Sequence, residues 1–116
     1  MRAGIGRRGL PVLLLALVFA APAAAQSESL RAAAQLTGLT SGMAAACKLD
    51  TKPVLHAFRD LMDRKQMQGK ERKRLVGIVS QSHDRAFATQ QRPGAMSCPE
   101  VRDQMRSTIR RLQRAK

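Results

Sequence analysis

Apolar residues recur at steps of three and four along most of the chain, which is the spacing of an amphipathic α-helix. β-branched residues are few, and no stretch long enough for a strand alternates between apolar and polar positions. The pattern predicts an all-α fold, a small four-helix bundle without a sheet.

The first predicted helix begins at Ser27 or Ser29, either of which can cap its N-terminus, and it reaches Cys47. Gly38 and Gly42 lower its helix propensity and indicate either a close crossing with another helix or a bend. The side chains expected to face the core are Leu30, Ala33, Leu36, Leu39 or Thr40, Met43 and Cys47.

The second and third helices are bounded by residues that start or stop helices. Asp50 is expected to cap the second helix, which tolerates Pro53 in its first turn. The pattern restarts near Gly69 and predicts a third helix over residues 70–90, which the sequence Arg92-Pro93-Gly94 ends. The expected apolar positions are Val54, Phe58, Leu61 and Met62 on the second helix, and Leu75, Val76, Val79, His83, Ala86 and Phe87 on the third.

The fourth helix has the clearest start signal in the chain. Ser97 and Glu100 have the spacing of a capping box, and Pro99 suits the first helical turn. The apolar stripe that follows is Val101, Met105, Ile109 and Leu112. Since few of the core candidates are aromatic, we expect a thin core, which is compatible with a homodimer.

The N-terminal 25 residues have the three parts of a secretory signal peptide. Arginines at the start precede an apolar run over residues 10–20 and the small-residue sequence Ala23-Ala24-Ala25. A retained membrane anchor is the alternative, but the run is shorter than the roughly 18 residues that a membrane span needs. We therefore expect cleavage after Ala25, a periplasmic or secreted location, and a single helical domain over residues 26–116.

The two cysteines are expected to form a disulfide bond. Export delivers the chain to an oxidising compartment, and Cys47 and Cys98 allow one pairing within a monomer. The alternatives are two free thiols, a redox pair or a bridge between chains. Redox pairs usually occur as Cys-x-x-Cys, which disfavours that alternative. A bridge would tie the end of the first helix to the start of the fourth.

Positive charge is the other strong feature of the sequence. The region after the predicted signal retains 18 of the 21 basic residues and all eight acidic ones, a net charge of +10. Two groups are candidates for anion binding: Arg64, Lys65, Arg72, Lys73 and Arg74 at the turn between the second and third helices, and Arg102, Arg106 and Arg110 on the fourth helix. Steps of four place the second group on one helix face, where arginine forks can pair with phosphates or carboxylates. The alternative is a solvated face without a ligand.

Other chemistry has little support in the sequence. Export argues against a nucleic-acid partner, and no aromatic residues interleave with the basic ones to stack on bases. His56 and His83 lie near helical stripes, where a structural histidine is commoner than a catalytic base, and neither has a cysteine or carboxylate at metal-ligand spacing. We expect no enzymatic activity, no metal and no cofactor.

The layout resembles the uncharacterised small exported helical proteins of Gram-negative bacteria. In these proteins, a cysteine that closes an early helix pairs with one just before the last helix; the positions that carry the resemblance are Cys47, Phe58, Leu61 and Cys98, together with the signal. The resemblance implies a periplasmic location and no activity. More distantly, the layout is similar to the small periplasmic acid-stress chaperones, whose switch depends on carboxylates, of which this chain has only eight.

These observations lead to one expected function and one alternative. We expect a periplasmic, non-enzymatic binding protein whose basic faces contact an anionic envelope component or an acidic protein partner. The alternative is a chaperone-like stress protein that holds unfolded client proteins in exposed grooves between its helices.

Overall fold

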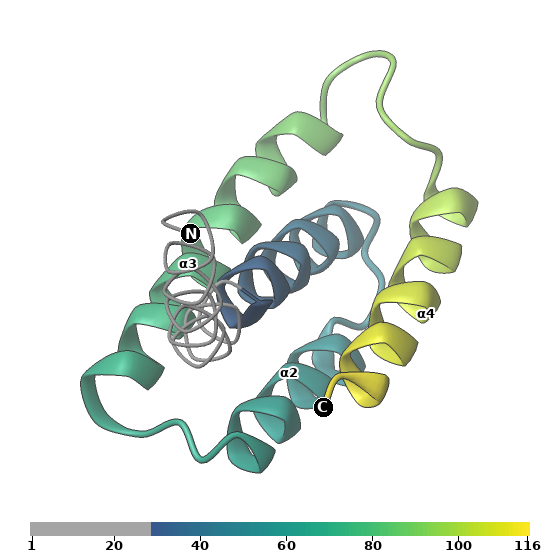
Figure 1. The fold of residues 1–116 in the computed structure, drawn as a ribbon. Coiled ribbons are helices and arrows are strands. Elements are labelled where there is room, and N and C mark those ends of the chain that lie inside the picture. The colour runs from purple at the N-terminus through teal and green to yellow at the C-terminus, as the bar shows by residue number, and fades with distance from the viewer. Residues whose placement is uncertain (1–28) are drawn as a thin grey trace, which may run out of the picture. The chain divides into compact units, whose positions relative to one another are not determined.

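The computed structural model describes residues 29–116, and this part of the chain folds into four α-helices without a strand. The helices are the first helix over residues 29–46, α2 (Lys52–Arg64), α3 (Gly69–Gln90) and α4 (Cys98–Arg114) (Figure 1). The predicted all-α four-helix bundle is thus confirmed. The predicted signal peptide over residues 1–25 and the cap at Ser27 lie outside the described residues.

The start of α4 agrees with its sequence signal. Ser97 occupies the N-cap position, and its Oγ accepts a hydrogen bond from the backbone N–H of Glu100 at 3.3 Å. The Ser97 hydroxyl also donates to a Glu100 carboxylate oxygen at 2.8 Å. In a complete capping box the glutamate would instead accept from the N-cap backbone N–H. α4 therefore begins where the sequence predicts, and the Glu100 carboxylate accepts a hydrogen bond from the capping hydroxyl of Ser97.

The start of α2 lies one residue later than Asp50 predicts. The N-cap position is Thr51, whose side chain makes no capping hydrogen bond. Asp50 acts from one residue further out, because its Oδ1 accepts the backbone N–H of Lys52 at 3.0 Å. An aspartate readily accepts from an N–H two residues on, so it still satisfies one of the unpaired donors at the helix start.

Non-glycine residues end two of the helices in the left-handed conformation. Gln66 follows α2 with φ of 56°, and Lys48 follows the first helix with φ of 58°. After α2, the N–H of Met67 bonds to the carbonyl of Met62 at 2.9 Å, and the N–H of Gln66 bonds to that of Asp63 at 3.0 Å. This pair of bonds is a Schellman motif, which usually has glycine at the left-handed position.

The substitution Gln66→Gly is expected to stabilise the protein by about 0.5 to 1 kcal/mol, because glycine adopts a positive φ without a steric penalty. The gain would be measured as a higher urea midpoint at an unchanged slope. The matched control is Gln68→Gly, since Gln68 has an extended backbone with φ of −143° and gains nothing from glycine. Equal midpoint changes in the two variants would contradict this account of the turn.

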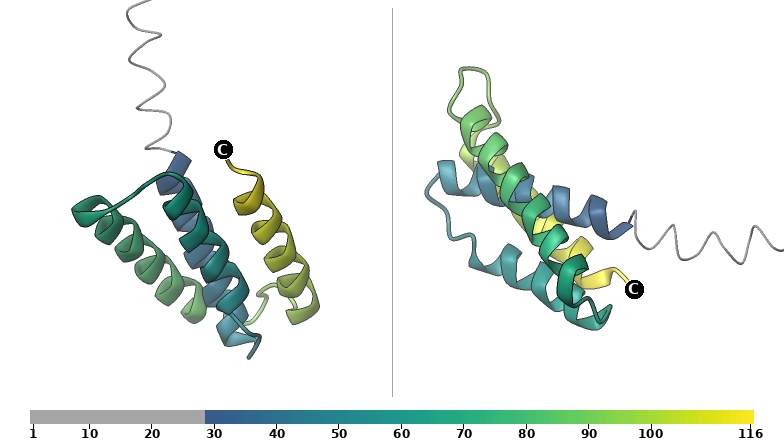
Figure 2. Two further views of the ribbon diagram at one scale, coloured as in Figure 1. Left: turned by 90° about the horizontal axis from the view of Figure 1, so that it is seen from below. Right: turned by 90° about the vertical axis from the view of Figure 1, so that its left-hand side faces the viewer.

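The first helix packs between α3 and α4, which lie on opposite sides of it in Figures 1 and 2. It meets α3 at Gly38 and Gly42, and it meets α4 at the pair Thr40 and Thr108. α2 packs against α4. These two helices supply the largest apolar side chains that are fully buried, which are Val54, Leu61, Val101 and Leu112.

The contact between the first helix and α3 is unusually close. A Cβ atom built on Gly38 would lie 2.4 Å from the backbone oxygen of Val79, and one built on Gly42 would lie 2.3 Å from that of His83. Any other residue at these positions would overlap the α3 backbone. Of the two interpretations that the sequence left open for these glycines, the structure selects the close crossing.

This crossing changes which face of the first helix is buried. The sequence allowed either Leu39 or Thr40 to face the core. Leu39 is 44% exposed, whereas Thr40 is fully buried, so Thr40 is the residue that faces the core. Ala33, Leu36 and Met43 are only partly buried. The prediction that these three side chains lie at the centre of the core is therefore wrong. Leu30 is buried as predicted, and the other residues of this helix that are fully buried beside the two glycines are Ala34, Thr37, Thr40, Ser41 and Ala44. Small side chains face inward because the glycine contact leaves no space there for leucine.

The buried hydroxyl groups all have hydrogen-bond partners. The hydroxyls of Thr40 and Thr108 bond to each other at 2.9 Å. Ser41 Oγ donates to the Gly38 carbonyl at 3.0 Å and lies 2.9 Å from His83 Nδ1. Within residues 29–116 no buried side-chain nitrogen or oxygen is left unpaired. The polar interior therefore avoids the cost of about 1 to 3 kcal/mol that an unpaired buried group carries.

α3 buries a narrower face than its sequence predicts. Leu75 and Ala86 are its buried residues, while Val76 is 50% exposed and Phe87 is 37% exposed. Because α3 meets the first helix through its Ser82 and Ala86 side, the flank with Val76 and Phe87 stays partly open to solvent. The prediction that these two residues belong to the core is wrong.

The predicted disulfide joins Cys47 and Cys98 in the structure. The two Cα atoms are 5.7 Å apart, and the residues are separated by 51 positions in the sequence. Cys47 directly follows the first helix, and Cys98 is the first residue of α4. The bond thus ties the C-terminal end of one helix to the N-terminal end of the other, as the cysteine positions predict.

Candidate functional site: the basic faces

The exposed face of α4 carries the predicted row of arginines. Arg102, Arg106 and Arg110 are all exposed, and they follow one another at four-residue steps over about 12 Å of the helix. The Arg106 guanidinium lies 3.7 Å from an Asp103 carboxylate oxygen, but both side chains are more than 60% exposed. Such an exposed pair contributes less than about 1 kcal/mol, so it leaves Arg106 free to contact a ligand.

The two basic residues at the end of α2 bind the end of α4. The Arg64 guanidinium donates to the carbonyl of Leu112 at 2.8 Å and to that of Ala115 at 3.3 Å. The ammonium group of Lys65 donates to the carbonyl of Lys116. These cations satisfy carbonyls that have no partner within the helix, and they offset the partial negative charge at its C-terminus.

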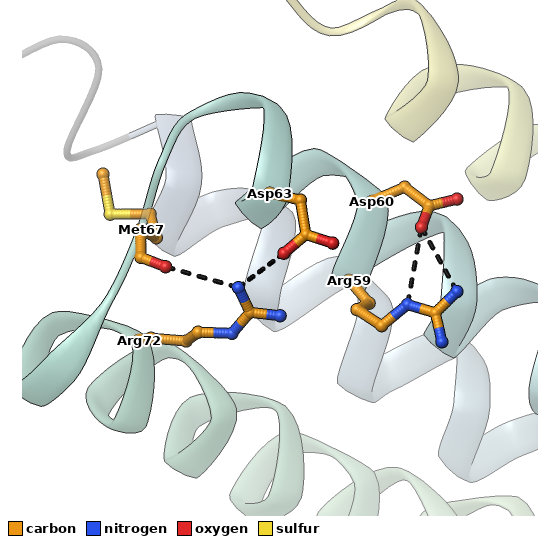
Figure 3. A network of polar contacts seen from close by, with 5 residues as sticks. All are labelled: Arg59, Asp60, Asp63, Met67 and Arg72. Carbon is orange, nitrogen blue, oxygen red and sulfur yellow. Dashed lines mark hydrogen bonds and ion pairs between the residues drawn. The ribbon is translucent and has the colours of Figure 1, made fainter.

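Arg72 is held at the turn between α2 and α3. Its guanidinium lies 2.6 Å from an Asp63 carboxylate oxygen and donates to the Met67 carbonyl at 3.3 Å (Figure 3). Arg59 and Asp60, also drawn in Figure 3, form a second pair at 3.3 Å, with both side chains more than half exposed. Arg72 therefore serves to fix the turn and is less available to an external anion than a free arginine.

The predicted turn group is thus divided in the structure. Arg64 and Lys65 lie against the end of α4, Arg72 pairs with α2, and Lys73 and Arg74 are exposed on the first turns of α3. The sequence signal, a run of cations around one turn, does not separate these three roles. Only the tertiary arrangement shows that part of the turn group binds backbone oxygens at the C-terminal end of α4.

The arrangement of Ser41 and His83 is structural. A serine hydroxyl 2.9 Å from a histidine nitrogen has the spacing of a nucleophile and its base. Ser41, however, is fully buried between the first helix and α3, and its hydroxyl already bonds to the Gly38 carbonyl. The pair holds two helices together at a point that a substrate cannot reach.

A shallow groove with a volume of about 330 Å³ runs between the first helix and α3. Leu39, Met43 and Ala86 form its apolar part, and Arg85 and Gln90 lie among its polar lining residues. The Gln90 side chain is fixed there because it donates to the carbonyl of Met96. The groove exists because Leu39 and Met43 lie outside the close glycine contact.

No group of three or more histidine, cysteine or acidic side chains in the described part of the chain is arranged to hold a metal ion. Among the helices of residues 29–116, none combines the length and the apolar character needed to cross a membrane.

Comparison with protein-family models, with characterised proteins and with solved structures gives no match to this chain.

Proposed function

We propose that the protein is a non-enzymatic binding protein of the periplasm that contacts an anionic envelope component through the exposed face of α4. The observation that carries the proposal is the row of Arg102, Arg106 and Arg110, which is exposed along its length. Arg102 and Arg110 form no ion pair within residues 29–116, so their charges are not neutralised by the fold. The signal-like sequence of the N-terminus supports the exported location.

A surface that carries many negative charges is the energetically favoured partner of this row. Each arginine close to an anionic lipid surface contributes about 1 kcal/mol, so three aligned arginines contribute about 3 kcal/mol. A single carboxylate would engage only one member of the row, since neighbouring members are about 6 Å apart along the helix axis. Extended polyanions and anionic membranes are therefore better partners for this row than small acids.

The variant Arg102→Gln/Arg106→Gln/Arg110→Gln is expected to bind vesicles of phosphatidylglycerol and phosphatidylcholine roughly 100-fold more weakly than the unmodified protein. Binding would be measured by co-sedimentation at about 50 and 200 mM salt, and the salt dependence should flatten together with the affinity.

The matched control is Arg31→Gln/Lys52→Gln/Arg92→Gln, which removes the same charge from exposed positions outside α4. This control should retain most of the affinity, and circular dichroism should show unchanged helicity in both variants. An equal loss in the two variants would contradict the proposal, because net charge rather than the α4 face would then explain binding.

The groove of Leu39 and Met43 supports the second candidate, a chaperone-like protein that holds unfolded clients. On that account the protein suppresses aggregation of reduced insulin at up to equimolar ratios, and Leu39→Gln weakens the effect while the triple arginine variant does not. Suppression with this dependence, together with absent vesicle binding, would replace the first proposal by the second.

A further inference from the structure

The last two turns of α4 contain a hollow that shares only Arg110 with the row of Arg102, Arg106 and Arg110. It has a volume of about 460 Å³, and its lining residues are Ser107, Arg110, Arg111, Arg114 and Ala115. All three arginines are exposed, and no acidic residue of the described chain lines the hollow. Three arginines and one serine therefore line a single depression.

Helix geometry explains why these side chains share one hollow. Ser107 and Arg111 are four residues apart, and so are Arg110 and Arg114, so each pair forms a ridge along the helix surface. The hollow lies between the two ridges. The nearest acidic residue on the same helix is Asp103, one turn before Ser107, and its carboxylate lies beside Arg106.

The end of a helix would ordinarily repel an anion, because its unpaired carbonyls carry partial negative charge. Here that repulsion is offset by Arg64, which donates to the carbonyls of Leu112 and Ala115, and by Lys65, which donates to that of Lys116. The same bonds hold the last turn of α4 in place. They also place the guanidinium of Arg64 next to the lining residue Ala115.

We propose that this hollow is a binding site for a phosphate group, as a phosphomonoester or a pyrophosphate. Arginine pairs with phosphate through two parallel hydrogen bonds, and three forks match the several terminal oxygens of such a group better than the two oxygens of a carboxylate. The Ser107 hydroxyl supplies a further donor. The inference deepens the proposed function by naming the anion, and it rests on that function only for the location of the ligand.

The test uses inorganic pyrophosphate and the full chain, with binding measured by isothermal titration calorimetry. The variant Arg111→Gln/Arg114→Gln should weaken binding at least about 10-fold, since it removes two arginine forks that can form charge-assisted hydrogen bonds to the phosphate oxygens. The control variant Arg31→Gln/Arg92→Gln has the same net charge and should change the affinity less than about twofold, because both residues are exposed and lie outside α4. Equal weakening in both variants would overturn the site.

The source of the phosphate is resolved by a second arm with phosphatidic acid vesicles, whose headgroup is a phosphomonoester. Displacement of the protein from these vesicles by pyrophosphate would place a lipid headgroup in the hollow, whereas pyrophosphate binding without vesicle binding would indicate a free phosphate ligand. Absent pyrophosphate binding would overturn the site but leave the proposed function intact if phosphatidylglycerol vesicles still bind. Pyrophosphate binding without any vesicle binding would support the hollow and contradict the proposed function.

Discussion

Replacing Gly42 by alanine is expected to destabilise the protein by about 3 kcal/mol. The added Cβ would lie 2.3 Å from the backbone oxygen of His83 and 2.8 Å from the Cβ of Ala86, so the first helix and α3 would have to separate. Overpacking of this kind costs about 1 to 3 kcal/mol or more, and backbone atoms cannot move aside as a flexible side chain can. This cost exceeds the gain of nearly 1 kcal/mol that alanine brings to a helix interior.

The same substitution at Gly77 provides the matched control. Gly77 also lies inside a helix, but a Cβ atom built there meets no atom within 4 Å. Gly77→Ala should therefore stabilise the protein by up to about 1 kcal/mol through helix propensity alone. Urea unfolding followed by circular dichroism would compare the two variants. Midpoint shifts of the same sign would show that the crossing at Gly42 is looser than the structure indicates.

Removal of the disulfide in the variant Cys47→Ser/Cys98→Ser is expected to lower the free energy of unfolding by about 4 kcal/mol. Cross-linking residues 51 positions apart removes that much loop-closure free energy from the unfolded chain. A loss of this size matters because small domains have a total stability of only about 5 to 15 kcal/mol. Cys98 is exposed and Cys47 is half-buried, so serine fits both positions without a packing penalty.

The disulfide prediction would be measured by urea unfolding of the oxidised protein, the double variant, and the protein after reduction and alkylation. The variant and the reduced protein should unfold at similar, much lower urea concentrations. A variant that unfolds at the midpoint of the oxidised protein would mean that the native packing alone provides the stability.

The boundaries of the helices could be predicted because local signals carry them. The start of α4 is marked by the local residues Ser97, Pro99 and Glu100. The end of α3 is marked by Pro93 and Gly94, which disfavour a helix. The disulfide could be predicted from the count of two cysteines together with the expected export. Each of these inferences depends on residues that are close in sequence or on the expected compartment.

The buried face of the first helix could not be predicted in the same way. Hydrophobicity ranks Leu39 above Thr40, but the approach of α3 at Gly42 decides which of them is inside. The candidate site shows the same limit. That Arg102 is exposed follows from the helical pattern, whereas the bonds of Arg64 to the carbonyls of α4 depend on how α2 meets α4.

The buried pair of Thr40 and Thr108 has a consequence for how this sequence can diverge. The two hydroxyls satisfy each other, so changing one threonine to valine would leave the other as an unpaired buried group. Changing both to valine keeps the shape and removes both polar groups, which is close to neutral. Relatives of this chain should therefore carry two threonines or two valines at these positions, and a mixed pair would mark a lineage in which the first helix has shifted against α4.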